Sequence, residues 1–66
     1  MMIEVYKNLF IVRREHRMTQ EDAGKLVNIC QQTYYLKEKG KRDFTLTEAK
    51  LLAQHFKTTV DDLFAK

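Results

Sequence analysis

One segment, residues 19–42 (TQEDAGKLVNICQQTYYLKEKGKR), constrains the fold more than any other part of the chain. It predicts a short helix from Gln20 to Val27, a tight turn, and a second short helix from Gln31 to Lys39. Thr19 has the position and type of an N-cap, and Asn28 tolerates the left-handed conformation that ends a helix. Isolated helices shorter than about 12–15 residues are marginal in water. The two helices therefore need support from the rest of the chain.

The flanking segments supply apolar residues at helical spacing. We expect a first helix from Ile3 to His16, a fourth from Leu46 to Phe56, and a short last helix that begins after Thr59. Gly40 is suited to end the third helix, because glycine adopts a positive φ without strain. The chain has no run of alternating β-branched residues that would indicate a strand. The predicted fold class is all-α, a compact five-helix bundle that forms a single domain over residues 1–66.

Length and composition argue against catalysis. A chain of 66 residues buries only roughly 60% of the surface that its unfolded form exposes, which leaves little room for an enclosed pocket. No Ser/His/Asp set, Cys/His set, carboxylate pair or glycine-rich phosphate loop can be identified. We therefore expect no enzymatic activity, no cofactor and no small-molecule ligand.

Cysteine content and hydropathy indicate the compartment. Cys30 is the single cysteine, so it cannot form an internal disulfide, and with two separated histidines it makes no metal-ligand cluster. We expect it to be a small, semi-buried side chain. No apolar run approaches the roughly 18 residues that a membrane-spanning helix requires, and the first residues lack the pattern of a signal peptide. We expect a cytoplasmic protein with no metal and no membrane partner.

The third predicted helix has a polar face suited to reading DNA. At 100° per residue, one side of it carries Gln31, Gln32, Tyr35, Leu36 and Lys39. A glutamine can form two hydrogen bonds with adenine in the major groove, and an apolar side chain can contact the methyl group of thymine. The tyrosine can reach a base edge or a phosphate, and the lysine can reach a phosphate. The base-reading candidates are therefore Gln31, Gln32, Tyr35 and Leu36. The alternative is an ordinary solvated face, which glutamines often form.

Cations follow that face directly. Lys39, Lys41 and Arg42 lie at the end of the third helix and in the loop after it. A net charge of +3, with an isoelectric point near 9.2, permits an anionic partner without demanding one. Thr45 opens the fourth helix, where backbone N–H groups favour anions. These four residues are candidates for phosphate contacts.

Several short motifs occur in a fixed order along the chain. They are Leu9-x-x-Val12-Arg13, Met18-Thr19-Gln20-Glu21, Glu38-Lys39-Gly40-Lys41-Arg42 and Asp61-Asp62-Leu63-Phe64. No single motif is specific, but their order and spacing resemble the lambda-repressor-like, Cro-type helix-turn-helix family, also called XRE-like. The resemblance extends from about Val5 to Phe64.

The resemblance implies a dimeric protein that binds double-stranded DNA sequence-specifically, usually a repressor from a phage or another bacterial mobile element. In such proteins the glutamine that opens the second helix contacts phosphate, which here is Gln20. The first residues of the third helix read bases, which here are Gln31 and Gln32. The resemblance also implies a structural ion pair between Arg13 and Glu38, which would fix the third helix against the first.

Dimer contacts are expected at four residues of the last two helices, Leu51, His55, Val60 and Phe64. A small core and an apolar last helix favour association. Leu51 and His55, with Ile11, lie off the main apolar stripes and also suit an alternative function. In that alternative the same fold serves as a protein-interaction module or an antitoxin, since a fold does not determine a function.

Four residues depart from the family pattern that the chain resembles. Lys37 stands where isoleucine is favoured: either its stem lies on the core and its ammonium reaches solvent, or the third helix is slightly rotated. Cys30 replaces a serine, so the third helix should lack that capping hydrogen bond. Gly24 replaces an alanine, which weakens the second helix but permits close packing. Phe44 replaces a proline and is expected to pack on the core.

Overall fold

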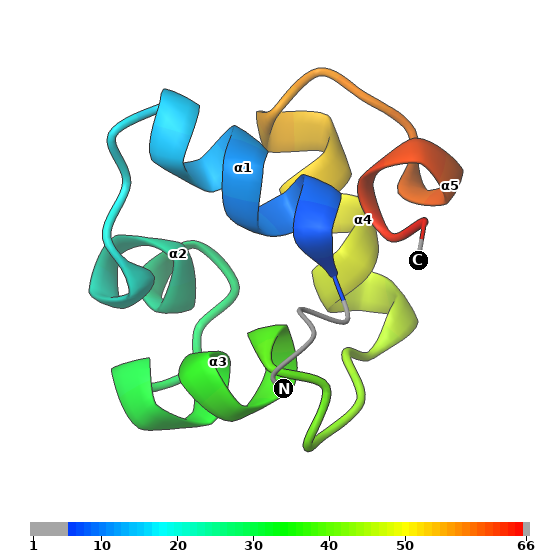
Figure 1. The fold of residues 1–66 in the computed structure, drawn as a ribbon. Helices are drawn as coiled ribbons and strands as arrows, with labels where there is room; N and C mark the ends of the chain where they lie inside the picture. The colour runs from blue at the N-terminus through cyan, green and yellow to red at the C-terminus, as the bar shows by residue number, and fades with distance from the viewer. Residues whose placement is uncertain (1–5, 66) are drawn as a thin grey trace.

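In the computed structural model, residues 6–65 form five short helices around one core (Figure 1). The helices are α1 (Lys7–Glu15), α2 (Gln20–Leu26), α3 (Gln31–Glu38), α4 (Leu46–His55) and α5 (Val60–Leu63). No strand occurs among the residues that the structure describes. The predicted all-α, five-helix fold is confirmed. The start of the predicted first helix, Ile3 to Val5, lies outside the described residues.

Every helix contributes to the core, which holds the two short helices α2 and α3 in place. The buried residues are Leu9, Ala23, Val27, Tyr34, Leu52, Ala53, Phe56 and Leu63. Half-buried aromatic rings extend this core: Phe44 makes edge contacts with Tyr6 and Tyr34, each at a centroid distance of 5.8 Å. Phe44 therefore packs on the core, as expected. Figure 1 shows α2 and α3 side by side, with α1, α4 and α5 forming the support.

Threonine residues cap the N-termini of α2, α4 and α5, as the sequence predicts. The Thr19 hydroxyl accepts the Asp22 N–H at 3.0 Å, and the Asp22 carboxylate accepts the Thr19 N–H at 3.0 Å. These bonds lower the pKa of Asp22. Thr45 opens α4 with the same reciprocal pair, and Thr59 accepts an N–H at the start of α5. Cys30 forms no side-chain capping bond at α3, as expected from the missing serine.

Each of the four longer helices is followed, two positions after its last residue, by a residue with positive φ. These residues are Arg17 (57°), Asn28 (66°), Gly40 (81°) and Lys57 (58°). After each of them the next N–H turns back to a carbonyl in the last helical turn, as in the bond from Met18 to Arg13 at 3.1 Å. This is the Schellman arrangement, which satisfies carbonyls that the helix leaves unpaired. Asn28 and Gly40 were expected from their residue types, whereas nothing in the sequence singled out Arg17 and Lys57.

We expect Lys57→Gly to stabilise the protein. Lys57 is exposed and holds a φ of 58° that its Cβ disfavours. Relief of that strain, less the added entropy of the unfolded chain, should yield about 0.5–1 kcal/mol. The opposite change, Gly40→Ala, places a Cβ at φ 81° and should destabilise. Urea unfolding of both variants measures the difference. A Lys57→Gly protein less stable than the wild type would contradict the strain assigned to this position.

Gly24 allows the turn after α2 to pass close to the helix. A Cβ on Gly24 would lie 2.7 Å from the carbonyl oxygen of Ile29, which is too close for any side chain. The Ile29 N–H also bonds to the Gly24 carbonyl at 2.8 Å. Glycine was expected to permit close packing of helices; the close contact that it permits is with the backbone of the turn, and it fixes the distance between α2 and the start of α3.

Candidate nucleic-acid interface

The side chains of α3 divide between the core and solvent. Tyr34 and Glu38 point inward, with 0% and 1% of their surface exposed. Gln31 and Gln32 are exposed in the first turn of the helix, and Tyr35 is 41% exposed. The helical period predicts this division for Gln32 and Tyr35. Gln31 lies seven positions before Glu38, on the same helical side, and is exposed as the first residue of α3. Two amide side chains therefore reach the surface at the start of a helix whose inner side is fixed.

Leu36 and Lys39 lie at the margin of that outer face, and both are half-buried. The Lys39 ammonium lies 5.9 Å from the centroid of the Tyr35 ring, a cation–π distance. The aromatic ring and the cation therefore restrict each other. The outer face thus carries polar, aromatic and cationic groups within two helical turns.

The environment of Lys37 differs from the expected one, in which its ammonium reaches solvent. Its ammonium does not reach solvent but lies 2.6 Å from Oε1 of Glu48 in α4, and the two side chains are 10% and 11% exposed. The reason is that α4 brings a carboxylate to the point where an isoleucine would otherwise pack. Burial raises the pKa of Glu48, but hydrogen bonds from Lys37 and the Thr45 N–H, with the charge of Lys37, lower it overall. Lys37 is thus committed to an internal ion pair.

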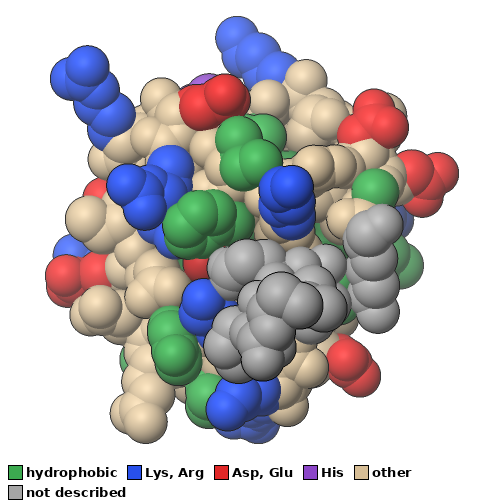
Figure 2. Space-filling view, in the orientation of Figure 1, with side chains coloured by type: hydrophobic (Ala, Val, Ile, Leu, Met, Phe, Trp, Pro, Cys, Tyr) green, Lys and Arg blue, Asp and Glu red, His purple; other side chains and the backbone are tan. Residues whose placement is uncertain are grey.

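Exposed cations follow α3. Lys41 and Arg42 lie in the loop between α3 and α4 and are exposed. Figure 2 shows basic side chains spread over this face of the molecule, with a group at its lower edge and acidic side chains chiefly toward the sides. Thr45 is exposed at the start of α4, but its backbone N–H already donates to Oε1 of Glu48 at 3.0 Å. Its hydroxyl hydrogen is the group that it can still offer to an anion.

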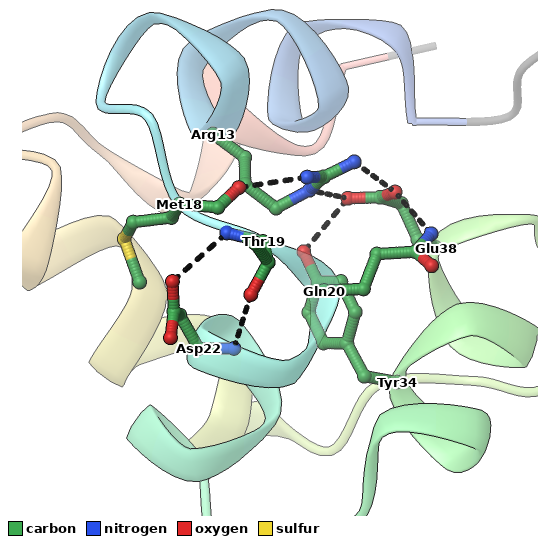
Figure 3. A network of polar contacts seen from close by, with 7 residues as sticks. All are labelled: Arg13, Met18, Thr19, Gln20, Asp22, Tyr34 and Glu38. Carbon is green, nitrogen blue, oxygen red and sulfur yellow. Dashed lines mark hydrogen bonds and ion pairs between the residues drawn. The ribbon is translucent and has the colours of Figure 1, made fainter.

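A buried polar network joins α1, α2 and α3 (Figure 3). Arg13 donates from Nε to Oε2 of Glu38 at 2.9 Å and from Nη2 to Oε1 at 3.0 Å. Its Nη1 donates to the Met18 carbonyl at 2.9 Å. The Tyr34 hydroxyl donates to Oε2 of Glu38 at 2.8 Å, and Gln20 Nε2 donates to Oε1 at 3.3 Å. The pair that the resemblance implied between Arg13 and Glu38 is therefore a two-bond contact at the centre of a larger network.

This network shifts the protonation equilibria of its members. Burial disfavours the charged form of Arg13, but the hydrogen bond and charge of Glu38 outweigh it and raise the pKa of Arg13. Burial raises the pKa of Tyr34, and the neighbouring charge of Glu38 raises it further. Both groups therefore keep their protons and serve as donors to Glu38. The inner side of α3 is anchored by fixed hydrogen bonds to the two preceding helices.

Cys30 is exposed, whereas a semi-buried position was expected. The N-cap of α3 lies at the outer edge of the turn, so its side chain does not reach the core. The sulfur lies 3.1 Å from the Thr33 hydroxyl. That hydrogen bond lowers the pKa of the Cys30 thiol.

The residues expected at a dimer contact occupy two environments. Leu51 is 38% exposed, and His55 is exposed one turn later on α4. Val60 and Phe64 are half-buried against the core of the same chain, and the Phe64 ring lies 5.2 Å from that of Tyr6. The structure thus gives Val60 and Phe64 a role in the core of the single chain and leaves Leu51 and His55 at the surface.

Among residues 6–65, no group of three or more His, Cys, Asp or Glu side chains is arranged to hold a metal ion. In the same range, no helix has both the length and the apolar character needed to cross a bilayer.

Two short helices joined by a tight turn, with the second exposing a polar face, define a helix-turn-helix protein. A family model described as helix-turn-helix matches residues 9–63, and the chain belongs to that family. It is also similar to an uncharacterized HTH-type transcriptional regulator of Methanocaldococcus jannaschii, with 38% identity over 52 residues, which is 79% of each chain. The family predicted from the ordered motifs is confirmed.

Proposed function

We propose that this protein is a transcriptional regulator that binds double-stranded DNA sequence-specifically, with α3 in the major groove. The observation that carries the proposal is the exposure of Gln31 and Gln32 at the start of a helix that Glu38 anchors at its other end. An α-helix fits the major groove, and a glutamine can bond both N6 and N7 of adenine. The related HTH-type transcriptional regulator supports this class of function.

Each surface residue then has a distinct role. Gln31 and Gln32 read base edges, and Tyr35 and Leu36 contribute contacts beside them. The phosphate contacts fall to Gln20, Lys39, Lys41, Arg42 and Thr45. Contacts with phosphates position a protein on the duplex, whereas contacts with base edges determine its sequence preference.

We further propose a homodimer that acts as a repressor, the mode that the resemblance to phage and mobile-element repressors implies. The exposed pair Leu51 and His55 is the surface through which two copies would meet. A two-fold dimer places its reading helices in major grooves about 34 Å apart. Occupancy of a promoter by such a dimer excludes polymerase without any further contact. A DNA target is consistent with the expected cytoplasmic location.

Paired substitutions test the assigned roles. Gln32→Ala should weaken binding to the preferred site by about 1–3 kcal/mol and leave non-specific binding nearly unchanged. Arg42→Ala should weaken binding to all sequences and reduce the slope of log K against log salt by about one unit. Fluorescence anisotropy over a salt series measures both effects.

Equal effects of the two substitutions on every duplex would contradict these roles. A protein that binds no duplex but forms a stable complex with a second protein would instead support the interaction-module alternative.

A further inference from the structure

Gln20, the first residue of α2, forms a hydrogen bond with a buried residue of α3. Its amide nitrogen donates to Oε1 of Glu38 at 3.3 Å, so a residue assigned to a phosphate contact is joined to a buried carboxylate (Figure 3). Gln20 itself is half-buried, at the boundary between the network and solvent. One surface side chain therefore connects the interior of the protein to the proposed interface.

The Glu38 carboxylate is held in place by hydrogen bonds from residues other than Gln20. Its side chain is 1% exposed, and three other hydrogen bonds hold its two oxygens, two from Arg13 and one from the Tyr34 hydroxyl. A carboxylate offers about four acceptor sites, so Gln20 occupies the one that remains. Both hydrogen bonds between Arg13 and Glu38 form without Gln20, so the bond from Gln20 is not needed to hold that pair.

The Gln20 amide has a nitrogen that donates hydrogen bonds and an oxygen that accepts them, so its orientation matters. A carboxylate only accepts hydrogen bonds, so the nitrogen of Gln20, and not its oxygen, has to face Glu38. The nitrogen carries two hydrogens, and Glu38 takes one. A phosphate also only accepts, and an amide turned the other way would present its oxygen to that phosphate. Arg13 neutralises the charge of Glu38, so the carboxylate can select the amide orientation without strongly repelling a nearby phosphate.

We infer that Glu38 is a positioning residue for DNA binding. It fixes the orientation of the Gln20 amide so that the second N–H is available to a backbone phosphate. Tyr34 and Arg13 contribute by holding the carboxylate. This inference rests on the proposed function and adds to it a residue that never touches the nucleic acid.

A double-mutant cycle tests the inference. The probe is a labelled random-sequence duplex at low salt, because a phosphate contact is independent of sequence. Gln20→Ala in the wild-type background should weaken binding about tenfold, the effect of one hydrogen bond to a charged group. In a Glu38→Gln background, where a neutral amide can present either end to Gln20, the same change should cost less than about twofold. Circular dichroism establishes that each variant is folded at the temperature used.

Two further variants keep the test decisive. Tyr34→Phe keeps the core ring but removes one donor to Glu38, and it should reduce the cost of Gln20→Ala even if Glu38→Gln proves unfolded. Lys41→Ala, a phosphate contact outside the network, should retain its full cost in every background.

Losses from Gln20→Ala that are equal in all backgrounds would overturn the positioning role while leaving DNA binding intact. A reduced cost of Lys41→Ala beside Glu38→Gln would also overturn it, since a general loosening of the fold would then account for the results. A wild-type protein that binds no duplex would instead refute the proposed function, and the inference with it.

Discussion

Arg13→Met should remove roughly 3–5 kcal/mol of folding stability, because it leaves the buried Glu38 carboxylate without its charged partner. Methionine retains an apolar stem of similar length, so the loss reports the charge and the hydrogen bonds rather than a cavity. A domain of this length has a total stability on the order of 3–10 kcal/mol. The variant should therefore be partly or largely unfolded at room temperature. Urea or thermal unfolding followed by circular dichroism measures the effect.

Arg14→Met is the matched control. The guanidinium groups of Arg13 and Arg14 lie at similar distances from the Phe10 ring, 5.5 Å and 5.4 Å from its centroid. Arg14, however, is exposed. Its replacement should change stability by no more than about 0.5 kcal/mol. Similar losses at the two positions would show that the buried pair does not hold α3 in place.

Lys37→Met should give the second-largest loss. It leaves the Glu48 carboxylate, which is 11% exposed, with the backbone of Thr45 but without its cation. Since Glu48 lies at the edge of the core, we expect a cost near the lower limit for a broken buried pair, about 3 kcal/mol. Lys25→Met breaks an exposed pair, in which Lys25 lies 3.8 Å from Glu21 and the side chains are 75% and 60% exposed. That change should cost at most about 1 kcal/mol.

The same pair gives the stability a pH dependence. The pKa of Glu48 lies below its ordinary value of 4.5 in the folded protein. A carboxylate with a lowered folded pKa stabilises the protein above its ordinary pKa, and this contribution is lost as the pH falls through the folded value. Stability should therefore decrease as the pH falls below about 5. Glu48→Gln should show a smaller decrease over this range, and an unchanged acid profile would contradict the role of Glu48.

The sequence allowed the local structure to be predicted because its signals act over three or four residues. Thr19 caps α2 and Thr45 caps α4 as expected, and Asn28 and Gly40 end helices at positive φ. The division of α3 into an inner and an outer face follows from its period, except that Gln31 shares the side of Glu38 and is exposed at the first turn. The first four helices each end one residue before the end that the sequence predicts, since capping residues resemble the helix that they end.

Contacts between helices were harder to predict. Lys37 and Glu48 are separated by eleven positions, and their pairing depends on how α4 crosses α3. The bond between Gln20 and Glu38 likewise depends on the position of α2 beside α3. Arg17 and Lys57 adopt left-handed conformations that their residue types disfavour. In these cases the packing of the whole chain determines the contact or the backbone conformation, and no local sequence pattern predicts it.

Selection of bound sequences from a random pool of duplexes is the most direct test of DNA reading by α3. The wild-type protein should enrich two symmetric half-sites whose centres lie about 34 Å apart, roughly one helical turn. A Gln31→Ala, Gln32→Ala double variant should lose the preference within each half-site but still bind the pool at low salt. Failure of the wild type to enrich any sequence, or enrichment of the same half-sites by the double variant, would contradict the assignment of α3 as the reading helix.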